Sequence, residues 1–407
     1  MMGIIACLLK HAVSIISMAL VSHFRPDHLN WSLLVIPVAG IMLVVAFQKF
    51  VARRKLGHGL DQIEDMIKTG NYNIPKVFAW GPLFAALLTL GFGGSAGAEG
   101  PIASSGSTIG SLVARKLNLP VRLMRILIAC GAGAGIAGIF KAPVAGVLFT
   151  VEVMGMELAT VPLVALVIAC LISGMTCYAL TGFTLDVPLK HVQMFDPSMS
   201  WWIILLGIFC GLYSLYYTYV GTLLRNLFRS IPDMWLKGLC SGGILSVVLF
   251  VFPALYGEGY TTMASIIDGD VDALIRYSLF NRTGITPGLG TAVIVCLGVA
   301  LFKPVACVST NSGGGVAGDF APTLFAGCMV GLFFAGGLNE WAGLGLPANN
   351  FAVSAMAAVM AGVIKAPLMA IFIVIEMTGY FGMTFPAMIA AGFSYSTVLI
   401  GRQLLKR

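Results

Sequence analysis

A short glycine-rich segment occurs twice in this chain, and it constrains the fold more than any other feature. Residues 93–101 read Gly-Gly-Ser-Ala-Gly-Ala-Glu-Gly-Pro, and residues 314–322, 221 positions later, read Gly-Gly-Val-Ala-Gly-Asp-Phe-Ala-Pro. Four further glycines keep the same spacing, namely Gly106 and Gly110 with Gly327 and Gly331. Matched landmarks in one order indicate an internal repeat.

A second pair of segments extends the repeat. Residues 137–152 and 361–376, 224 positions apart, share Ala-Gly, then Lys-Ala-Pro, then a final glutamate. We therefore predict a single domain over 1–407 that consists of two related halves, 1–183 and 200–407.

The composition places both halves in a membrane. The chain is 58% hydrophobic and 10% charged, with a mean hydropathy of +0.94, whereas a soluble domain carries about 25% charged residues. Runs long enough to cross a bilayer are 32–48, 160–183, 200–224, 238–256 and 286–302. We also expect 3–22 to be a retained helix. Since open sheet edges are excluded from lipid, we predict an all-α polytopic membrane protein.

The distribution of charge indicates the orientation. The net charge is +7, but Lys and Arg lie in short connectors such as Arg53-Arg54-Lys55 and Arg225 with Arg229, which is typical of cytoplasmic ends and not of a nucleic-acid surface. Asp186 and Asp196 flank a connector that would face outward. We expect an integral membrane protein that contacts lipid and no nucleic acid.

The segment around Glu99 has the residues of an anion site. Pro101 suits the first turn of a helix, and a helix that begins there would aim free N–H groups and its positive dipole end at the glycines before it. Glu99 lies at that point, and a carboxylate inside an apolar protein is a functional candidate by default. It would occupy the place of the anion and leave on protonation. The alternative is that Glu99 only caps its own helix.

The repeat favours the functional interpretation of Glu99. Residues 314–322 would build a second helix start of the same design, and interrupted apolar segments at corresponding places in two halves point to a transport site between them. Two such helix starts that point inward would form one shared anion pathway.

No other chemistry stands out in the sequence. The nine cysteines lie mostly in apolar runs without a Cys-x-x-Cys pair, and the five histidines are scattered, so we expect neither a metal site nor a cofactor. Gly133-Ala134-Gly135-Ile136-Ala137-Gly138 matches a dinucleotide-binding pattern, but no strand precedes it. Gly131 and Gly135 favour a helix-packing face instead. A membrane-embedded enzyme or scaffold is the alternative from another class, and we do not expect an enzyme.

Several of these motifs resemble the CLC family of chloride channels and chloride/proton antiporters. Gly97-Ala98-Glu99-Gly100-Pro101 resembles its Gly-Arg-Glu-Gly-Pro signature, and Gly318-Asp319-Phe320-Ala321-Pro322 resembles its Gly-x-Phe-x-Pro signature. Gly57-His58-Gly59-Leu60-Asp61 is a degenerate likeness of Gly-Ser-Gly-Ile-Pro. The segments ending at Glu152 and Glu376 also resemble the family in the same order.

The resemblance, which is to the bacterial members of the family, implies a protein of the bacterial inner (cell) membrane. It also implies a homodimer with one independent pore per subunit, each built of two inverted halves with broken helices that meet at a central anion pathway. It implies that Glu99 is the gating and proton-coupling residue. Phe320 and Ala321 would bind the central anion through backbone N–H groups, and the backbone at Ala98 and Gly100 would serve an outer anion site.

The chain departs from the chloride pattern in three ways: at the family serine, at an inner acid, and at the tyrosine near the inner gate, which would fall at or just past Arg407. The family serine that touches the central anion falls on His58, which either donates to the anion or is a surface-loop residue. Val153 follows Glu152 where coupled antiporters carry a second glutamate. Asp319, inside the second signature, either binds the anion or caps its helix.

These departures leave two possible transported anions, chloride and fluoride. We predict a CLC-type anion transporter, either a voltage-gated channel or an anion/proton antiporter, that most closely fits chloride. The alternative in the same superfamily is a fluoride/proton antiporter, whose members also lack the serine and the inner acid.

Overall fold

The computed structural model describes residues 1–22, 24, 29–57, 72–156, 159–188, 194–270, 274–275 and 289–405. Within these ranges the chain is helical and has no strand. The α-helices are α1 (Met2–Val21), α2 (Ile36–Ala46), α4 (Gly81–Gly91), α5 (Glu99–Lys116), α6 (Val121–Phe140), α7 (Pro143–Glu152), α8 (Thr160–Leu180), α9 (Ser200–Arg229), α10 (Met234–Val251), α11 (Tyr260–Ile267), α12 (Leu289–Ser312), α13 (Phe320–Ala342), α14 (Ala348–Ile364), α15 (Pro367–Thr378) and α16 (Thr384–Leu405). Short 3-10 turns precede α4, α9 and α16, and a π-helical turn, Phe47–Ala52, continues α2.

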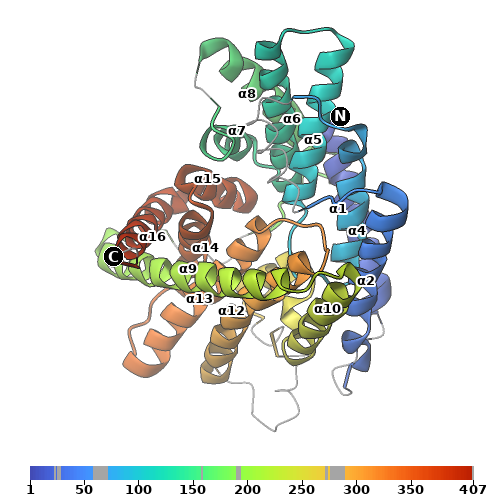
Figure 1. Ribbon diagram of the computed structural model, residues 1–407. Helices are drawn as coiled ribbons and strands as arrows, with labels where there is room; N and C mark the ends of the chain where they lie inside the picture. Colours follow the sequence, from blue (N-terminus) through green and yellow to red (C-terminus); the bar gives the residue numbers. More distant parts are fainter. Residues whose placement is uncertain are drawn as a thin grey trace.

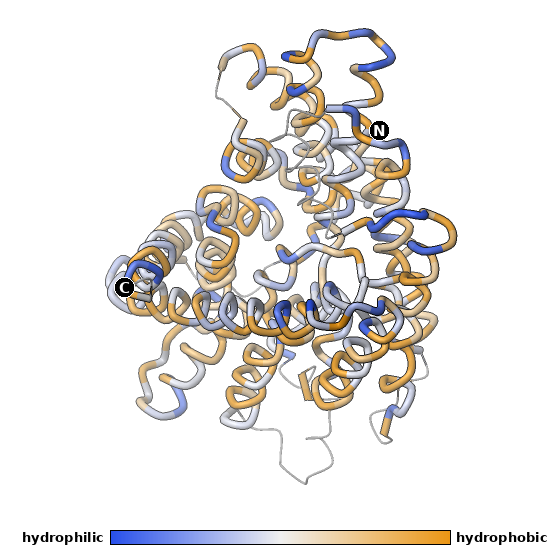
Figure 2. The backbone as a smooth tube through the Cα atoms, in the orientation of Figure 1, coloured by the Kyte–Doolittle hydropathy of each residue, from blue (hydrophilic) through white to orange (hydrophobic). Residues whose placement is uncertain are grey.

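The all-helical membrane fold predicted from the sequence is confirmed. Among the described residues, nine helices are long and apolar enough to cross a bilayer. They include helices at each of the five apolar runs named above. Figure 2 shows that hydrophobic residues predominate along the helices.

The helices form an inner and an outer set. Buried residues make up 72% of the most apolar stretch of α6 and 78% of that of α13, compared with 17% for α1 and 28% for α8. Helix α9 runs across the molecule and contacts α12, α14 and α16 (Figure 1). Thus α6 and α13 lie in the protein interior, while α1 and α8 present most of their surface outward, where lipid can solvate it.

Helix α5 is buried although its sequence is not strongly apolar. The helix carries several buried serines and threonines, and two of the serines bond to nearby carbonyl oxygens: Ser105 Oγ donates to Ala79 O (2.5 Å), and Ser111 Oγ donates to Tyr72 O (2.6 Å). These bonds satisfy polar groups that would otherwise be costly inside the protein. The neighbouring helices therefore allow a polar helix at membrane depth.

The repeated glycines mark two equivalent helix crossings. A methyl group on Gly106 in α5 would collide with the carbonyl of Gly131 in α6, and Gly110 lies equally close to Leu127 O. In the second half, Gly327 and Gly331 of α13 lie against the carbonyls of Ala355 and Phe351 in α14. The packing face predicted for Gly131 and Gly135 is confirmed, because Gly135 lies against Ile102 of α5.

Helices α7 and α15 cap each other. Glu152, the last residue of α7, accepts from Leu368 N (3.2 Å) and Met369 N (2.8 Å) at the start of α15. Glu376 of α15 accepts in turn from the backbone N–H groups of residues 144 and 145, at 3.1 and 2.9 Å, at the start of α7. Each carboxylate thus satisfies free N–H groups at the positive end of the other helix. The division into halves 1–183 and 200–407 stays a prediction.

Candidate anion pathway

The two repeated loops lie back to back in the interior. Gly97 N donates to Gly318 O (3.0 Å) and Gly318 N donates to Gly97 O (2.6 Å), so two segments 221 residues apart form a short antiparallel bridge. Gly93 and Gly314, also 221 apart, have φ of +92° and +110°. Only glycine adopts these angles without strain, which explains why both loops open with a glycine.

One threonine anchors each loop, and it comes from the helix that precedes the other loop. The Thr310 hydroxyl at the end of α12 accepts from Ser95 N (3.0 Å), and the Thr89 hydroxyl at the end of α4 accepts from Val316 N (3.1 Å). Thr89 and Thr310 are again 221 positions apart, so the repeat extends further toward the N-terminus than the sequence comparison had traced it.

Glu99 reaches from one helix start to the other. It is the first residue of α5 and only 1% exposed. Its Oε1 accepts from Phe320 N (2.5 Å) and Ala321 N (2.9 Å) at the start of α13. The carboxylate therefore caps the helix of the other half and not its own. It lies where an anion held by the two N–H groups would lie.

The start of α5 also carries a carboxylate. Ala98 N donates to Oε1 of Glu258 (2.9 Å). Glu258 lies in the turn between α10 and α11, and no sequence motif had pointed to it. Gly100 is buried beside Gly318. Ala98, Glu99, Gly100, Phe320 and Ala321 thus gather at one point.

Asp319 and His58 differ from these residues. Asp319 Oδ1 accepts from Asn311 Nδ2 (2.9 Å) and Cys307 Sγ (3.2 Å), both on α12. Asp319 is the N-cap residue of α13, but its side chain makes no cap bond there, so the side-chain cap considered as an alternative is wrong. His58 lies outside the described residues. Its neighbour Gly57 lines a cavity that also reaches Gly314 and Gly315.

A buried ammonium group lies beside the bridged loops. Lys303 of α12 is fully buried, donates to Ser95 Oγ (2.8 Å) and lies 4.8 Å from the centre of the Phe325 ring. A buried charge is stable only with compensating partners, and the carboxylates of Glu99 and Glu258 lie within its electrostatic reach. No motif had pointed to Lys303, although a lysine inside an apolar run is itself a signal.

Two cavities approach the bridged loops. One, of about 450 Å³, reaches Gly313–Gly315 and is lined by basic residues: Lys55, Arg225, Arg229 and Lys237. The other, of about 940 Å³, is lined by Lys10, Asp186 and Glu258 among others. The positive-inside rule predicts that the basic cavity lies on the cytoplasmic side of the membrane and that the Asp186 cavity, called the outer cavity below, lies on the other side.

The outer cavity is bordered by an ion network. Asp186 pairs with Lys10 (2.5 Å) and with Lys141 (3.0 Å). Burial alone would raise the pKa of Asp186, but the two ammonium groups more than offset burial and lower it. Both Lys141 and Lys365 lie at helix ends, but Lys141 is buried, whereas Lys365 is exposed. Asp186 compensates the charge of the buried Lys141.

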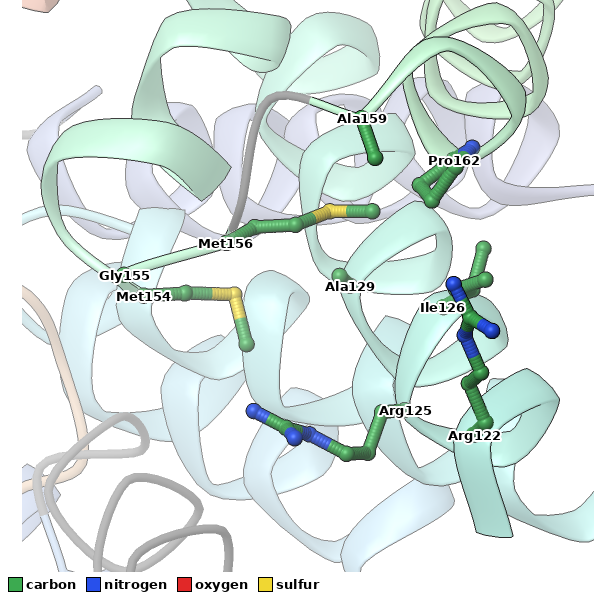
Figure 3. A pocket seen from close by; sticks show the side chains of 9 residues that line it. All are labelled: Arg122, Arg125, Ile126, Ala129, Met154, Gly155, Met156, Ala159 and Pro162. Carbon is green, nitrogen blue, oxygen red and sulfur yellow. The ribbon is translucent and has the colours of Figure 1, made fainter.

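A third cavity, of about 330 Å³, lies apart from this pathway. Figure 3 shows Arg122 and Arg125 of α6 on one side and Met154 and Met156 on the other. None of the residues that bind Glu99 lines this cavity, so we do not include it in the pathway.

These features define a class of protein. Two related sets of interrupted helices aim their starts at one buried point between two aqueous cavities, which is the architecture of membrane transporters built from internal repeats. The chain belongs to the voltage gated chloride channel family, whose model matches residues 39–399. It is therefore an integral membrane protein that transports anions, and not an enzyme.

Relatives and solved structures agree with this membership. A ClcB-like protein of Ralstonia nicotianae is 27% identical over 90% of this chain and 82% of its own length. The H(+)/Cl(-) exchange transporter ClcA of Vibrio vulnificus is 25% identical over 82% of this chain and 69% of its own. The fold is similar to a slow cyanobacterial Cl-/H+ antiporter (TM-score 0.79, 24% identity, 100% of this chain and 96% of that one) and to a CLC-type fluoride/proton antiporter (TM-score 0.72, 22% identity, 97% and 91%).

Proposed function

We propose that this protein exchanges chloride for protons and that Glu99 is its gate. The observation that carries the proposal is the pair of bonds from Phe320 N and Ala321 N to one oxygen of Glu99. An ionised carboxylate there competes with the transported anion for the same N–H groups. A protonated carboxyl group is neutral, a poorer acceptor, and yields the site to the anion. Each cycle of release and return therefore couples one carboxyl proton to anion movement.

Chloride is the substrate that the described site fits best. The groups that face the Glu99 oxygen are backbone N–H groups at a helix start, and the Phe320 ring packs against Phe149 (5.9 Å between centroids). A large, weakly hydrated anion suits such donors, since dipoles without a fixed full charge bind it and still release it. The Asp319 carboxylate accepts hydrogen bonds from α12 instead and takes no part in the bonds that hold the Glu99 oxygen.

Family membership supports three further proposals about the setting. The protein works in the inner membrane of a bacterium, in contact with lipid, since its curated relatives include bacterial exchange transporters. It forms a homodimer with one pathway in each subunit. Where its transport moves net charge, the rate responds to membrane voltage.

Paired anion efflux from proteoliposomes tests the proposal. Vesicles are loaded with the potassium salt of chloride or fluoride, and valinomycin is added so that K⁺ can leave with the anion and balance its charge. The external anion concentration and the external pH are recorded together. We expect chloride efflux with proton movement in the wild type, and chloride efflux without proton movement and nearly independent of pH in Glu99→Gln. Unchanged pH dependence in Glu99→Gln would remove the gating role. Fluoride efflux well above chloride efflux would assign the protein to the fluoride branch.

A further inference from the structure

The turn that carries Glu258 contacts α13 on one side and the loop that begins at Gly93 on the other. It lies between Gly257 and Gly259, whose φ values of +68° and +87° favour glycine. A methyl group on Gly259 would collide with the Phe325 ring of α13. On the other side, Tyr256 Oη donates to Gly91 O (3.0 Å), and its ring packs against Gly93. The turn is thus held between the loop that begins at Gly93 and helix α13.

From this turn Glu258 reaches the start of α5. Its Oε1 accepts from Ala98 N, the N-cap residue of α5. Glu99 accepts in the same manner at the start of α13. Each of the two helix starts that meet in the interior therefore has a carboxylate at the position where an anion would bind. Glu258 lines the outer cavity, whereas Glu99 is almost fully buried.

The charges around Glu258 make its protonation state important for an entering anion. Lys10 of α1, Lys303 of α12 and Asp186 act on it electrostatically, as does Glu99 of α5. Lys141 lies behind Asp186, and the hydroxyls of Tyr256 and Tyr260 flank the turn. Three ammonium groups thus face three carboxyl groups. Glu258 lies outside the nine candidate spans, and burial, which exceeds the opposing effect of Lys10, raises its pKa. Neutralising it leaves the outer approach with an excess of positive charge, which attracts an anion.

We propose that Glu258 is a second, outer gate: its carboxylate occupies the Ala98 N–H group and must be neutralised or displaced before an anion can pass from the outer cavity to the Glu99 position. The proposal rests on the proposed function, since it presumes that anions pass Glu99. It gives the pathway two carboxylate gates in series. The outer one faces water and the inner one is sealed from it.

Flux measurements separate the two gates. Glu258→Gln removes the charge, Glu258→Ala removes the acceptor, and Glu258→Asp keeps the charge. A hydrogen bond to a charged group is stronger than a neutral one by a margin that corresponds to about tenfold in affinity. We expect chloride efflux at pH 7.5 to be about tenfold faster in the Gln and Ala variants than in the wild type. We also expect chloride efflux in these variants to increase less than in the wild type when the pH is lowered. Glu340→Gln, at an exposed position of α13, is the matched control and should behave as the wild type.

A comparison of the Glu258 variants with Glu99→Gln distinguishes a failure of the proposed function from a failure of the outer gate. If neither the wild type nor Glu99→Gln moves an anion, the proposed function fails. If Glu99→Gln changes pH dependence while all Glu258 variants match Glu340→Gln, only the outer gate is overturned. The double variant Glu99→Gln/Glu258→Gln should conduct faster than either single variant, since both gates are then neutral.

Bromide diffraction gives a readout that does not depend on transport. Crystals of Glu258→Ala grown in bromide should show an anomalous peak within hydrogen-bond distance of Ala98 N, and wild-type crystals at neutral pH should not. A peak of equal height in both would overturn the proposal, because the Glu258 carboxylate would then not exclude the anion. Size-exclusion profiles of each variant verify that the protein is folded.

Discussion

At the scale of single residues, the pathway is defined by which hydrogen-bond donor each carboxylate binds. Glu99 crosses to α13, Glu258 binds the start of α5, and Asp319 binds α12. The three acids lie near one another but differ in role because their acceptor oxygens face different donors. Lys303 is a buried cation within electrostatic reach of Glu99 and Glu258, and its ammonium group favours the ionised forms of these two acids.

Replacing Lys303 should therefore change the pH at which the pathway opens. In Lys303→Met the carboxyl groups lose a neighbouring positive charge, so their protonated forms become more favourable. We expect the half-maximum of chloride efflux to move to higher pH by about one unit. Lys303→Arg should retain the wild-type profile. Lys76→Met, at an exposed position, is the control, and an unshifted profile in Lys303→Met would show that its charge does not reach the gates.

At the scale of helices, the internal repeat is visible as paired contacts. The Gly106 and Gly327 crossings, the threonine anchors and the caps of α7 and α15 each occur once in either half. In each case a small residue or a polar side chain allows backbones to approach closely. This close approach fixes the directions in which α5 and α13 point, and so places their first N–H groups at one site.

The two glycine crossings should be equally sensitive to substitution. Gly106→Ala and Gly327→Ala each place a methyl group against a backbone carbonyl, and such overpacking costs about 1–3 kcal/mol. We expect a lower melting temperature in detergent for both. Gly392→Ala in α16, where the added methyl group has open space, is the control and should be neutral or slightly stabilising. A similar melting temperature for all three would contradict the close crossing.

At the scale of the whole molecule, Asp186 connects segments that are distant in sequence. It pairs with Lys10 of α1 and with Lys141 at the end of α6, and Lys141 also donates to Thr184 O (2.8 Å). Because this network is mostly buried, its loss would leave two ammonium groups without their counter-ion. The network therefore stabilises the outer end of the protein.

The Asp186 network should make stability depend on pH in one direction. The pKa of Asp186 is lower in the folded protein than its ordinary value, so its contribution is complete above about pH 4 and is lost as the pH falls through the lowered pKa. We expect the melting temperature of the wild type to fall in that acid range. The melting temperature of Asp186→Asn should be lower at neutral pH and should fall less on acidification. Equal slopes for the two proteins would contradict this.

Some of this arrangement could be predicted from the sequence and some could not. The repeat, the membrane spans and the residues at both helix starts follow from local patterns, since glycine, proline and apolar runs act over a few residues. The partner of each carboxylate does not, because it depends on how distant elements meet. Glu258 lies 160 positions from Ala98, and Glu99 caps a helix 221 positions away. The pair Thr89 and Thr310 could have been predicted, because these residues have the same 221-residue spacing as the repeated glycines.

The bridge between Gly97 and Gly318 has a consequence for the speed and the temperature dependence of gating. Because two backbone hydrogen bonds join the loops, the backbone N–H groups around the transported anion form one rigid frame that is set when the protein folds. Opening then requires the rotation of a carboxylate side chain within a fixed scaffold, a motion intrinsically far faster than a domain movement. We therefore expect turnover to be paced by proton arrival and ion dehydration, and the activation enthalpy to follow the chemistry of the ion and not the flexing of the protein.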